Sequence, residues 1–330
     1  MSEPTLDVAG LGNALVDVLS FEDDDFVVRH ELLRGAAMMV DMERSEAVYA
    51  DMGPTIETSG GSAANTIAGL ASFGSRTGFI GRVHDDELGR AFQHDLQSLG
   101  VRFTARPTTD GAPTGRCLVI VAPDAERTLC TYLGCAAELG NDDLDLSLVS
   151  DAAITYVEGY LWDQPPAMEA IRRALTAARD ADRMVAMTLS DPFCVDRHRD
   201  DFRELLDDQI DVLFANEEEI RSLFEVATFD EALQAVRGRC DIAVLTRGAS
   251  GSVIVTNGDV HVVDAVPVDD LVDTTGAGDL FAAGFLHGLA RGDSLPLCGE
   301  LGSLAAAEAI SHLGPRPMVS LADLSATRLS

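Results

Sequence analysis

Short runs of aliphatic and β-branched residues alternate with helical patterns through the second half of the chain. The apolar runs cover residues 153–157, 184–189, 210–215 and 242–246. Helical patterns lie between them at residues 166–178 and 217–224. Strands that are apolar on both faces and separated by helices are typical of a parallel sheet covered by helices on both sides. The second half therefore predicts an α/β fold.

The first half contains a further core strand and an amphipathic helix. Residues 77–80 form an apolar run typical of a buried strand. Asp85 and Asp86 follow it, and acidic residues favour a helix N-terminus. Four apolar residues then fall on one helical face, at Leu88, Phe92, Leu96 and Leu99. The same α/β pattern thus extends toward the N-terminus.

Two segments interrupt this alternation, at residues 27–56 and 115–132. In the second segment, strand-like runs flank a turn at residues 123–126. We expect both segments to pair as a small separate sheet that covers the site as a lid. The expected organisation is a single domain over residues 1–330, with lid segments at roughly 14–57 and 103–135 inserted in the large α/β unit.

The C-terminal part predicts a hairpin followed by two long helices. Asn257-Gly258 separates two strand-like runs, at residues 252–256 and 260–263, and this dipeptide strongly favours a tight hairpin turn. Apolar helical patterns then cover residues 277–290 and 298–312. They complete the helical layers of the predicted fold.

The charge of the chain narrows the classes of partner. The formal net charge is −31, and such a surface repels nucleic-acid phosphates and anionic membranes. We therefore expect neither as a partner, although the acidity itself can reflect solubility or a salty cytoplasm. All 24 basic residues are arginines. The absence of lysine excludes a Walker phosphate loop, a protein kinase and a Schiff-base enzyme, which each require one.

The cysteines and the hydropathy of the chain predict a cytoplasmic protein. The six cysteines form no C-x-x-C pair, so buried reduced thiols are expected rather than disulfides or structural zinc. Residues 1–12 lack the apolar length of a signal peptide, and no later stretch reaches the ~18 apolar residues of a membrane span.

The sequence Val-Asp-Thr-Thr-Gly-Ala-Gly-Asp at residues 272–279 leads directly into an apolar helix. Free amides at a helix start bind anions, and Gly276 and Gly278 let the backbone approach a phosphate closely. A carboxylate beside an incoming anion is repelled, unless it serves as a general base that faces an acceptor hydroxyl. Asp279 is therefore a candidate base. The alternative interpretation is an ordinary capping aspartate on a closely packed helix.

This segment closely resembles the second signature of the PfkB (ribokinase-like) kinase family. The resemblance implies that Asp279 is the catalytic base and that the amides of Gly276, Ala277 and Gly278 form the anion hole. It also implies a ribokinase-like three-layer α/β sandwich, which is Rossmann-like with a mostly parallel sheet and a small β-sheet lid. The expected activity is transfer of phosphate from ATP, with Mg²⁺, to a hydroxyl group.

The first signature of the family also has a counterpart here. Residues 59–66, Ser-Gly-Gly-Ser-Ala-Ala-Asn-Thr, resemble the family's G-G-x-x-x-N substrate motif. Paired glycines let a ligand lie against the backbone, and an asparagine offers both a donor and an acceptor to a sugar hydroxyl. The resemblance thus makes Gly60, Gly61 and Asn65 substrate-binding candidates. The alternative interpretation is a tight turn before a helix.

Further family landmarks follow in order along the chain. The Gly-Asn-Ala-Leu-Val-Asp run at residues 12–17 resembles the first-strand motif, which makes Asn13 and Asp17 candidates for holding ribose hydroxyls. Gly10 and Gly12 also suggest a dinucleotide-binding turn, but Leu15 stands where that fingerprint requires its third glycine. A Rossmann dinucleotide site is therefore not expected.

The remaining landmarks concern the nucleotide and its cations. Asn216 and Glu219 resemble the N-x-x-E motif that organises magnesium and phosphate partly through water, which suits the water-rich coordination of Mg²⁺. Three residues resemble the T-x-G-x-x-G nucleotide loop, at Thr246, Gly248 and Gly251. Asp273 and Thr275 match positions whose carbonyls help to hold a monovalent cation in many members, and the use of K⁺ stays open.

Three short segments, at residues 113–117, 127–129 and 158–160, resemble the corresponding segments of adenosine kinases more than those of ribokinases or fructokinases. These motifs contain Cys117 and Leu129 as substrate-binding candidates. Tyr160 falls where an aromatic ring stacks on adenine, and Arg127 where a lid arginine approaches the phosphates on closure. We expect phosphorylation of adenosine to AMP. The alternatives are a sugar kinase for ribose, fructose or a relative, and an inactive ligand-binding protein on the same fold. Monomer and homodimer both stay open.

Overall fold

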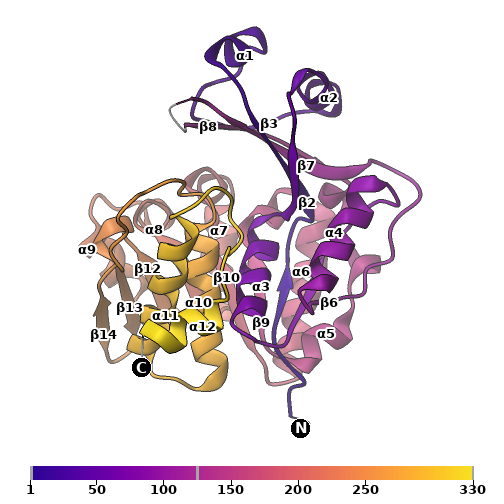
Figure 1. The fold of residues 1–330 in the computed structure, drawn as a ribbon. Helices are drawn as coiled ribbons and strands as arrows, with labels where there is room; N and C mark the ends of the chain where they lie inside the picture. Colours follow the sequence, from indigo (N-terminus) through magenta and orange to yellow (C-terminus); the bar gives the residue numbers. More distant parts are fainter. Residues whose placement is uncertain (1–2, 124–125, 329–330) are drawn as a thin grey trace.

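The computed structural model describes residues 3–123 and 126–328. In these residues the larger sheet has nine strands, drawn in Figure 1. They lie in the spatial order β14 (Val260–Val263), β13 (Ser252–Thr256), β12 (Ile242–Thr246), β11 (Val212–Asn216), β10 (Met184–Thr188), β9 (Ala152–Glu158), β1 (Leu6–Leu11), β5 (Thr77–Ile80) and β6 (Arg102–Phe103). The strands from β12 to β6 are parallel, and β13 and β14 form an antiparallel edge.

The strands predicted in the second half are confirmed. β9 to β12 coincide with the four expected apolar runs to within two residues at either end. The hairpin β13–β14 turns at Asn257-Gly258 as expected. These strands are buried on both faces, which explains why their sequences are apolar without alternation.

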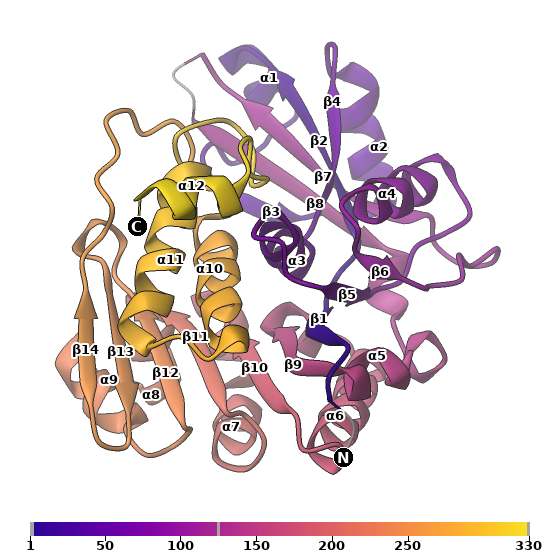
Figure 2. The ribbon, with the colours of Figure 1, turned by 60° about the horizontal axis from the view of Figure 1, so that its bottom comes forward.

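Helices cover both faces of the larger sheet. One face carries α3 (Ser62–Ser72), α4 (Glu87–Ser98), α10 (Ala277–Arg291), α11 (Leu295–Ala309) and α12 (Leu321–Arg328). The other carries α5 (Leu146–Asp151), α6 (Pro165–Asp180), α7 (Pro192–Asp208), α8 (Glu217–Phe224) and α9 (Phe229–Val236). Each layer has its own hydrophobic cluster, so the predicted three-layer α/β sandwich is confirmed. Figure 2 shows α10 and α11 side by side, with α12 across one end.

Close packing fixes the position of α10, whose first turn carries Asp279. A Cβ added at Gly284 in this helix would lie 2.3 Å from the carbonyl oxygen of Leu301 in α11. On the opposite side, Gly69 of α3 lies against Leu280 and Ala283. Small residues therefore hold α10 tightly between two neighbouring helices.

A second sheet of five strands stands over the carboxyl edge of the larger one (Figure 1). We call it the lid sheet. Its spatial order is β3 (Ala37–Met39), β8 (Arg127–Gly134), β7 (Thr114–Val121), β2 (Leu15–Phe21) and β4 (Ile56–Gly60). The chain enters it directly after β1 and returns through β4 into α3. Two short crossings thus connect the lid sheet to the carboxyl edge of the larger sheet.

Residues 27–56 differ from the all-strand expectation. They contain the second half of α1 (Asp24–Arg29) and all of α2 (Met42–Asp51), with only the short β3 between them. Asp23 and Asp41 begin these helices, because their side chains accept from the amides of Phe26 and Arg44 at 2.9 and 2.8 Å. In the turn expected at residues 123–126, residues 124 and 125 lie outside the described residues.

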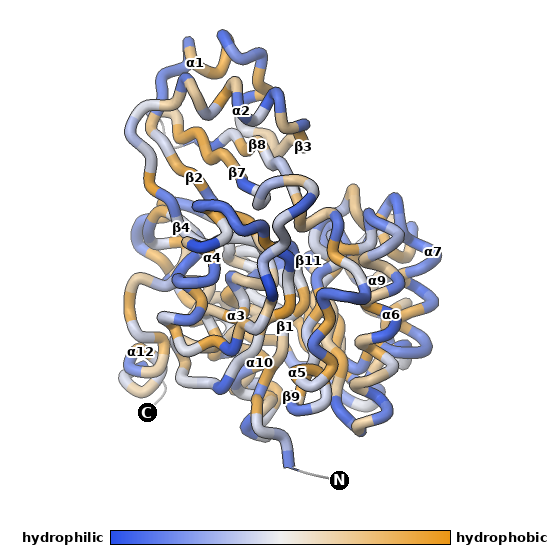
Figure 3. Tube along the Cα trace, turned by 90° about the vertical axis from the view of Figure 1, so that its right-hand side faces the viewer, coloured by the Kyte–Doolittle hydropathy of each residue, from blue (hydrophilic) through white to orange (hydrophobic). Residues whose placement is uncertain are grey.

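The lid sheet has one face toward α1 and α2 and one toward the larger sheet. Val18, Leu118 and Ile120 belong to the same cluster as Phe26 and Val48 of the two helices. The alternate residues of the same strands form a separate apolar cluster, at Leu19, Cys117, Val119, Val121 and Leu129. Figure 3 shows the apolar stretches along β2 and along β1, an interior strand of the larger sheet. The period of two therefore gives the lid an apolar inner face.

Helix ends differ from expectation at two places. Leu99, expected to share one helical face with Leu88, Phe92 and Leu96, is 45% exposed, because α4 ends at Ser98 and Leu99 is its C-cap. α11 begins before the expected residue 298, since Ser294 is its N-cap and a proline lies in its first turn.

All six cysteines are free thiols, as expected. Among the described residues, no helix has the length and hydropathy needed to span a bilayer.

Candidate active site

Predicted site residues meet at the carboxyl edge of the larger sheet. Asn13 follows β1, Asn216 ends β11 and Thr246 ends β12. β1 lies between β5 and β9, so the strand order reverses direction there. Ligands of open α/β sheets bind at such a point outside the carboxyl ends.

Two neighbouring cavities occupy this edge. The larger cavity, of about 550 Å³, lies between the larger sheet and the inner face of the lid sheet. The smaller cavity, of about 220 Å³, lies at the start of α10. Ser62 and Asp279 line both cavities. These two residues therefore form a shared wall between two ligand-sized spaces.

Asp279 is oriented by two donors from α3. One carboxylate oxygen accepts from Ser62 Oγ at 2.7 Å and the other from Asn65 Nδ2 at 3.1 Å. Burial raises the pKa of Asp279 above its usual range, whereas these hydrogen bonds and the charge of Arg316 act to lower it. The result is a fixed carboxylate that is a stronger base than an exposed aspartate.

The helix start beside Asp279 has the conformation that its glycines allow. Gly276 is the N-cap of α10 with φ 79°, and a Cβ there would lie 2.5 Å from that of Pro315. A Cβ at Gly278 would meet no described heavy atom within 4 Å, so its backbone borders open space. The amide of Ala277 donates to the carbonyl oxygen of Thr274 at 3.2 Å, which closes a turn. All three predicted anion-hole residues line the smaller cavity.

Glu158 is a site residue to which the sequence analysis gave no role. It is buried, and its Oε1 accepts from both the amide and the side-chain Nδ2 of Asn13, at 2.8 and 2.7 Å. Its Oε2 accepts from the amide of Ala63 at 2.8 Å. Burial raises the pKa of Glu158 to about 7. This carboxylate joins the ends of β1 and β9 to the start of α3 and orients Asn13 in the larger cavity.

Asp17 and the glycine pair meet where the lid sheet joins α3. Asp17 lines the larger cavity, and burial raises its pKa to about 7. A Cβ at Gly60 would lie 2.4 Å from the Asp17 carboxyl group. Gly61 has φ 96°, and a Cβ there would lie 2.2 Å from the carbonyl oxygen of Asn13. Gly61 lines the cavity, whereas Gly60 makes room for the carboxylate.

The rest of the larger cavity is apolar on its lid side. Cys117 and Leu129 line it from the inner face of the lid sheet. Tyr160 lines it from the 3₁₀ helix η3 (Gly159–Asp163), which directly follows β9. Burial raises the pKa of the Tyr160 hydroxyl. The cavity therefore combines a polar end at Asp279 with apolar and aromatic walls.

Arg127 reaches from the lid sheet to the loop before α10. Its Nη1 lies 2.8 Å from Asp273 Oδ2, and the two side chains are 8% and 2% exposed. Asp273 also accepts from the amides of Thr275 and Gly314, at 3.0 and 2.9 Å. Nε and Nη2 of Arg127 are buried without a hydrogen-bond partner in the described residues. Arg127 and Thr275 line the larger cavity.

Asn216 and Glu219 form a capping box at the start of α8. Asn216 Oδ1 accepts from the amide of Glu219 at 2.9 Å, and Glu219 Oε2 accepts from the amide of Asn216 at 2.9 Å. Glu219 lines the smaller cavity at 5% exposure, and burial raises its pKa to about 7. The described residues hold no cluster of three or more His, Cys, Asp or Glu side chains suited to a metal. One buried carboxylate in a polar cavity fits Mg²⁺ that keeps water and phosphate ligands.

The predicted nucleotide loop is only partly at the cavities. Thr246 lines the smaller cavity. Gly248 and Gly251 flank the turn η4 (Gly248–Ser250) with φ 55° and 79°, and neither is among the residues that line the two cavities. Arg247, which lies between Thr246 and Gly248, pairs with Glu217 at 3.1 Å. The loop therefore leads away from the smaller cavity, with only Thr246 lining it.

Several known proteins are similar to this chain over most of its length. The family model described as pfkB family carbohydrate kinase matches residues 39–321. Adenosine kinase from Sinorhizobium meliloti is 44% identical with a TM-score of 0.92, and the match covers 98% of this chain and 99% of that one. A probable sugar kinase protein from Rhizobium etli CFN 42 is 43% identical with a TM-score of 0.93, covering 98% of both chains. Adenosine kinase from Saccharomyces cerevisiae is 27% identical over 92% of this chain and 95% of its own length.

The family match covers β4, β7 and β8 of the lid sheet, the strands of the larger sheet from β5 onward and the helix start at Asp279, whereas β1 and β2 lie before it. It confirms the family and the kinase activity that the two signature motifs predict. The absence of lysine is compatible with this assignment, because backbone amides at a helix start can bind phosphate. The chain therefore belongs to the pfkB family of carbohydrate kinases and is an ATP-dependent kinase.

Proposed function

We propose that this kinase transfers the γ-phosphoryl group of ATP to the primary hydroxyl of adenosine and forms AMP and ADP. The observation that carries the proposal is the shared wall: Asp279 borders both a cavity of nucleoside size and the helix start. An acceptor hydroxyl at this wall lies beside a base on one side and the phosphate donors on the other.

In this mechanism, Asp279 accepts the hydroxyl proton while the acceptor oxygen bonds to the γ-phosphorus and the bond to the ADP oxygen breaks. Ser62 and Asn65 hold the carboxylate in position through the hydrogen bonds described above. The backbone at Gly276 and Gly278 stabilises the charge that develops on the transferred group. Base catalysis contributes roughly 10²–10⁴-fold to such a reaction.

We assign the nucleotide to the smaller cavity and the adjoining sheet edge. Asn216 and Thr246 border the triphosphate there, and Glu219 is the residue that would hold Mg²⁺. When bound, Mg²⁺ neutralises phosphate charge, which matters in a chain of net charge −31. Arg127 supplies a further positive charge from the lid. Gly248 and Gly251 shape the loop that continues toward the adenine base of ATP.

The acceptor assignment is supported by the walls of the larger cavity. Tyr160 offers an aromatic face to adenine, and Cys117 and Leu129 enclose the base from the lid. Asp17 and the side chain of Asn13 face the ribose hydroxyls. The 44% identity to an adenosine kinase supports the same acceptor. A sugar acceptor such as ribose or fructose is the second candidate, because a probable sugar kinase is 43% identical.

A radiolabelled phosphate-transfer assay tests the acceptor. We expect the purified protein with [γ-³²P]ATP and Mg²⁺ to label adenosine far faster than inosine, ribose or fructose. Faster labelling of ribose or fructose would replace the nucleoside assignment with the sugar one. The Asp279→Asn variant is the control for contaminating kinases, since it must lose the labelling of any true acceptor.

The role of a monovalent cation and the compartment belong to the same proposal. The Asp273 carboxylate is committed to Arg127 and two amides, so only backbone carbonyls at Asp273 and Thr275 remain for K⁺. Replacing KCl with tetramethylammonium chloride in the assay tests this role.

The free cysteines and the use of ATP support a cytoplasmic location.

A further inference from the structure

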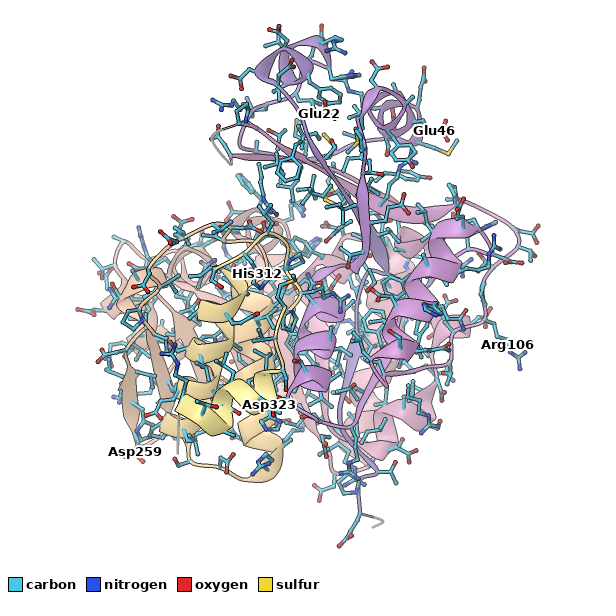
Figure 4. The ribbon with its side chains drawn as sticks, in the orientation of Figure 1. Glu22, Glu46, Arg106, Asp259, His312 and Asp323 are labelled. Atoms are coloured by element: carbon cyan, nitrogen blue, oxygen red, sulfur yellow. The ribbon has the colours of Figure 1, made fainter. Side chains whose placement is uncertain are left out.

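The loop after α11 carries an arginine that neither signature motif contains. Figure 4 marks this loop at His312, near the boundary between the lid and the larger unit. Arg316 follows four residues later. Its Nε donates to the carbonyl oxygen of Ser59 at 3.0 Å, and its Nη2 donates to Ser59 Oγ at 2.9 Å. Burial lowers the pKa of Arg316 to about 10, so the guanidinium stays charged at neutral pH.

Ser59 continues the contact into a helix of the larger unit. Its amide donates to Asp95 Oδ2 at 3.1 Å, and its hydroxyl donates to the same oxygen. Asp95 belongs to α4, and Ser59 lies on β4 of the lid sheet. The chain of contacts from Arg316 through Ser59 to Asp95 therefore joins three segments that are distant in sequence.

Ser59 occupies the return crossing of the lid. β4 pairs antiparallel with β2, with Ser59 opposite Val16, and the next two residues are Gly60 and Gly61. These glycines lead into α3, which carries Ser62 and Asn65. A fixed Ser59 thus fixes the start of the helix that orients Asp279.

The same loop supports the helix start on its other side. The amide of Gly314 donates to Asp273 Oδ2 at 2.9 Å, and Pro315 lies against Gly276 at the N-cap of α10. Gly314 and Pro315 also line the larger cavity. Residues 313–316 therefore touch the lid crossing, the acceptor cavity and the start of α10 at once.

The charge of Arg316 adds to this arrangement. Asp17, Asp95 and Asp279 are the carboxylates whose electrostatic attraction acts on its guanidinium. Its Nη1 is buried without a partner among the described residues. One buried cation thus lies among three acidic groups on β2, α4 and α10.

We propose that Arg316 is a positioning residue that joins the lid's return crossing to the loop under the helix start, and so aligns the acceptor hydroxyl with Asp279. The inference rests on the kinase reaction proposed above. Because Arg316 acts on the acceptor side, the nucleotide residues Asn216 and Thr246 lie outside its contacts. Its loss therefore affects the acceptor and the transfer step rather than the affinity for ATP.

The test compares Arg316→Met with wild type, using the acceptor that the wild type phosphorylates fastest. We expect kcat to fall by about 10²-fold, as a misplacement of about 1 Å does, and the acceptor KM to rise, while the ATP KM stays within about twofold. Arg291→Met, on the exposed end of α10, is the matched control and should match wild type. A wrong acceptor assignment alters the wild-type screen, not the ratio of variant to wild type.

Two further measurements separate positioning from a general loss of structure. Arg316→Lys keeps the charge and one donor, so we expect it to recover part of kcat. Guanidinium ion added at millimolar concentration should raise the activity of Arg316→Ala but not that of Arg291→Ala. If Arg316→Met does not fold, Ser59→Ala removes the Oγ contacts with Arg316 and Asp95, keeps the carbonyl contact with Arg316, and should show the same KM pattern at smaller size. An unchanged kcat and acceptor KM in a folded variant, or an equal rise of the ATP KM, would overturn the proposal.

Discussion

The replacement Asp279→Asn tests the base role with little change in structure. Asparagine has the same shape, and its two side-chain atoms can keep both existing contacts. The Ser62 hydroxyl can rotate to accept from the new Nδ2, while the new Oδ1 accepts from Asn65 Nδ2. The substitution thus removes the charge and the proton acceptor but leaves the hydrogen-bonding pattern.

The expected size of the effect follows from the contacts of this carboxylate. Loss of a general base lowers kcat by roughly 10²–10⁴-fold, which corresponds to about 2.7–5.4 kcal/mol in the activation free energy. Stability should not fall, because burial already disfavours the charged form of Asp279 and raises its pKa. The variant should therefore have a much lower kcat and a free energy of unfolding that is equal to or higher than that of the wild type.

The assay measures initial rates against pH, together with thermal unfolding. In the wild type, activity should fall as the pH drops through the raised pKa of Asp279, since only the ionised form accepts a proton. The variant should lack this acidic limb. Asp323→Asn is the matched control, because Asp323 also lies in the first turn of a helix but is exposed and away from the cavities (Figure 4). A variant with wild-type kcat and the same acidic limb would refute the base role.

Three further predictions concern charge and backbone. Glu219→Gln removes a buried charge whose pKa is about 7, but it turns one acceptor of Asn216 into a donor, so in denaturant titrations it should add less than about 3 kcal/mol to unfolding stability at pH 8 relative to its effect below pH 4.5. It should also raise the Mg²⁺ concentration for half-maximal activity. Gly61→Ala should lose more stability than Gly74→Ala, since both glycines have positive φ, at about 1–2 kcal/mol of strain, but only Gly61 has backbone in the path of a Cβ. Arg127→Met should cost about 3 kcal/mol in the same titration and lower kcat, because it leaves Asp273 buried without its cation; equal stability would contradict the burial argument.

Local sequence patterns were sufficient for the elements of the larger sheet. β12 and α8 have the bounds expected from their apolar runs, because a strand buried on both faces and a capped helix are encoded within a few residues. The lid helices were missed. Their capping residues Asp23 and Asp41 lie in a segment whose apolar face only becomes clear once β2 packs beneath it.

For the candidate site too, the sequence indicates only those residues whose signal is local. Residues inside the two signature motifs, such as Asn65 and Asp279, were found because the motif and the chemistry lie within one short segment. Glu158 and Arg316 were assigned no role, because their partners are distant in sequence: Asn13 lies 145 residues from Glu158, and Ser59 lies 257 residues from Arg316. Only the fold brings such pairs together, and a lone charged residue before or after an element carries no local signal of them.

The shared wall at Ser62 and Asp279 separates the cavity proposed for the acceptor from the cavity proposed for the phosphates. In the proposed mechanism, the acceptor occupies the cavity lined by the lid strands and η3, and the phosphates occupy the cavity lined by strand ends and a helix start. Substitutions in the lid can therefore alter which alcohol enters without disturbing how the phosphoryl group is held. This partition gives a physical reason why relatives so similar in structure can carry the names of both nucleoside and sugar kinases.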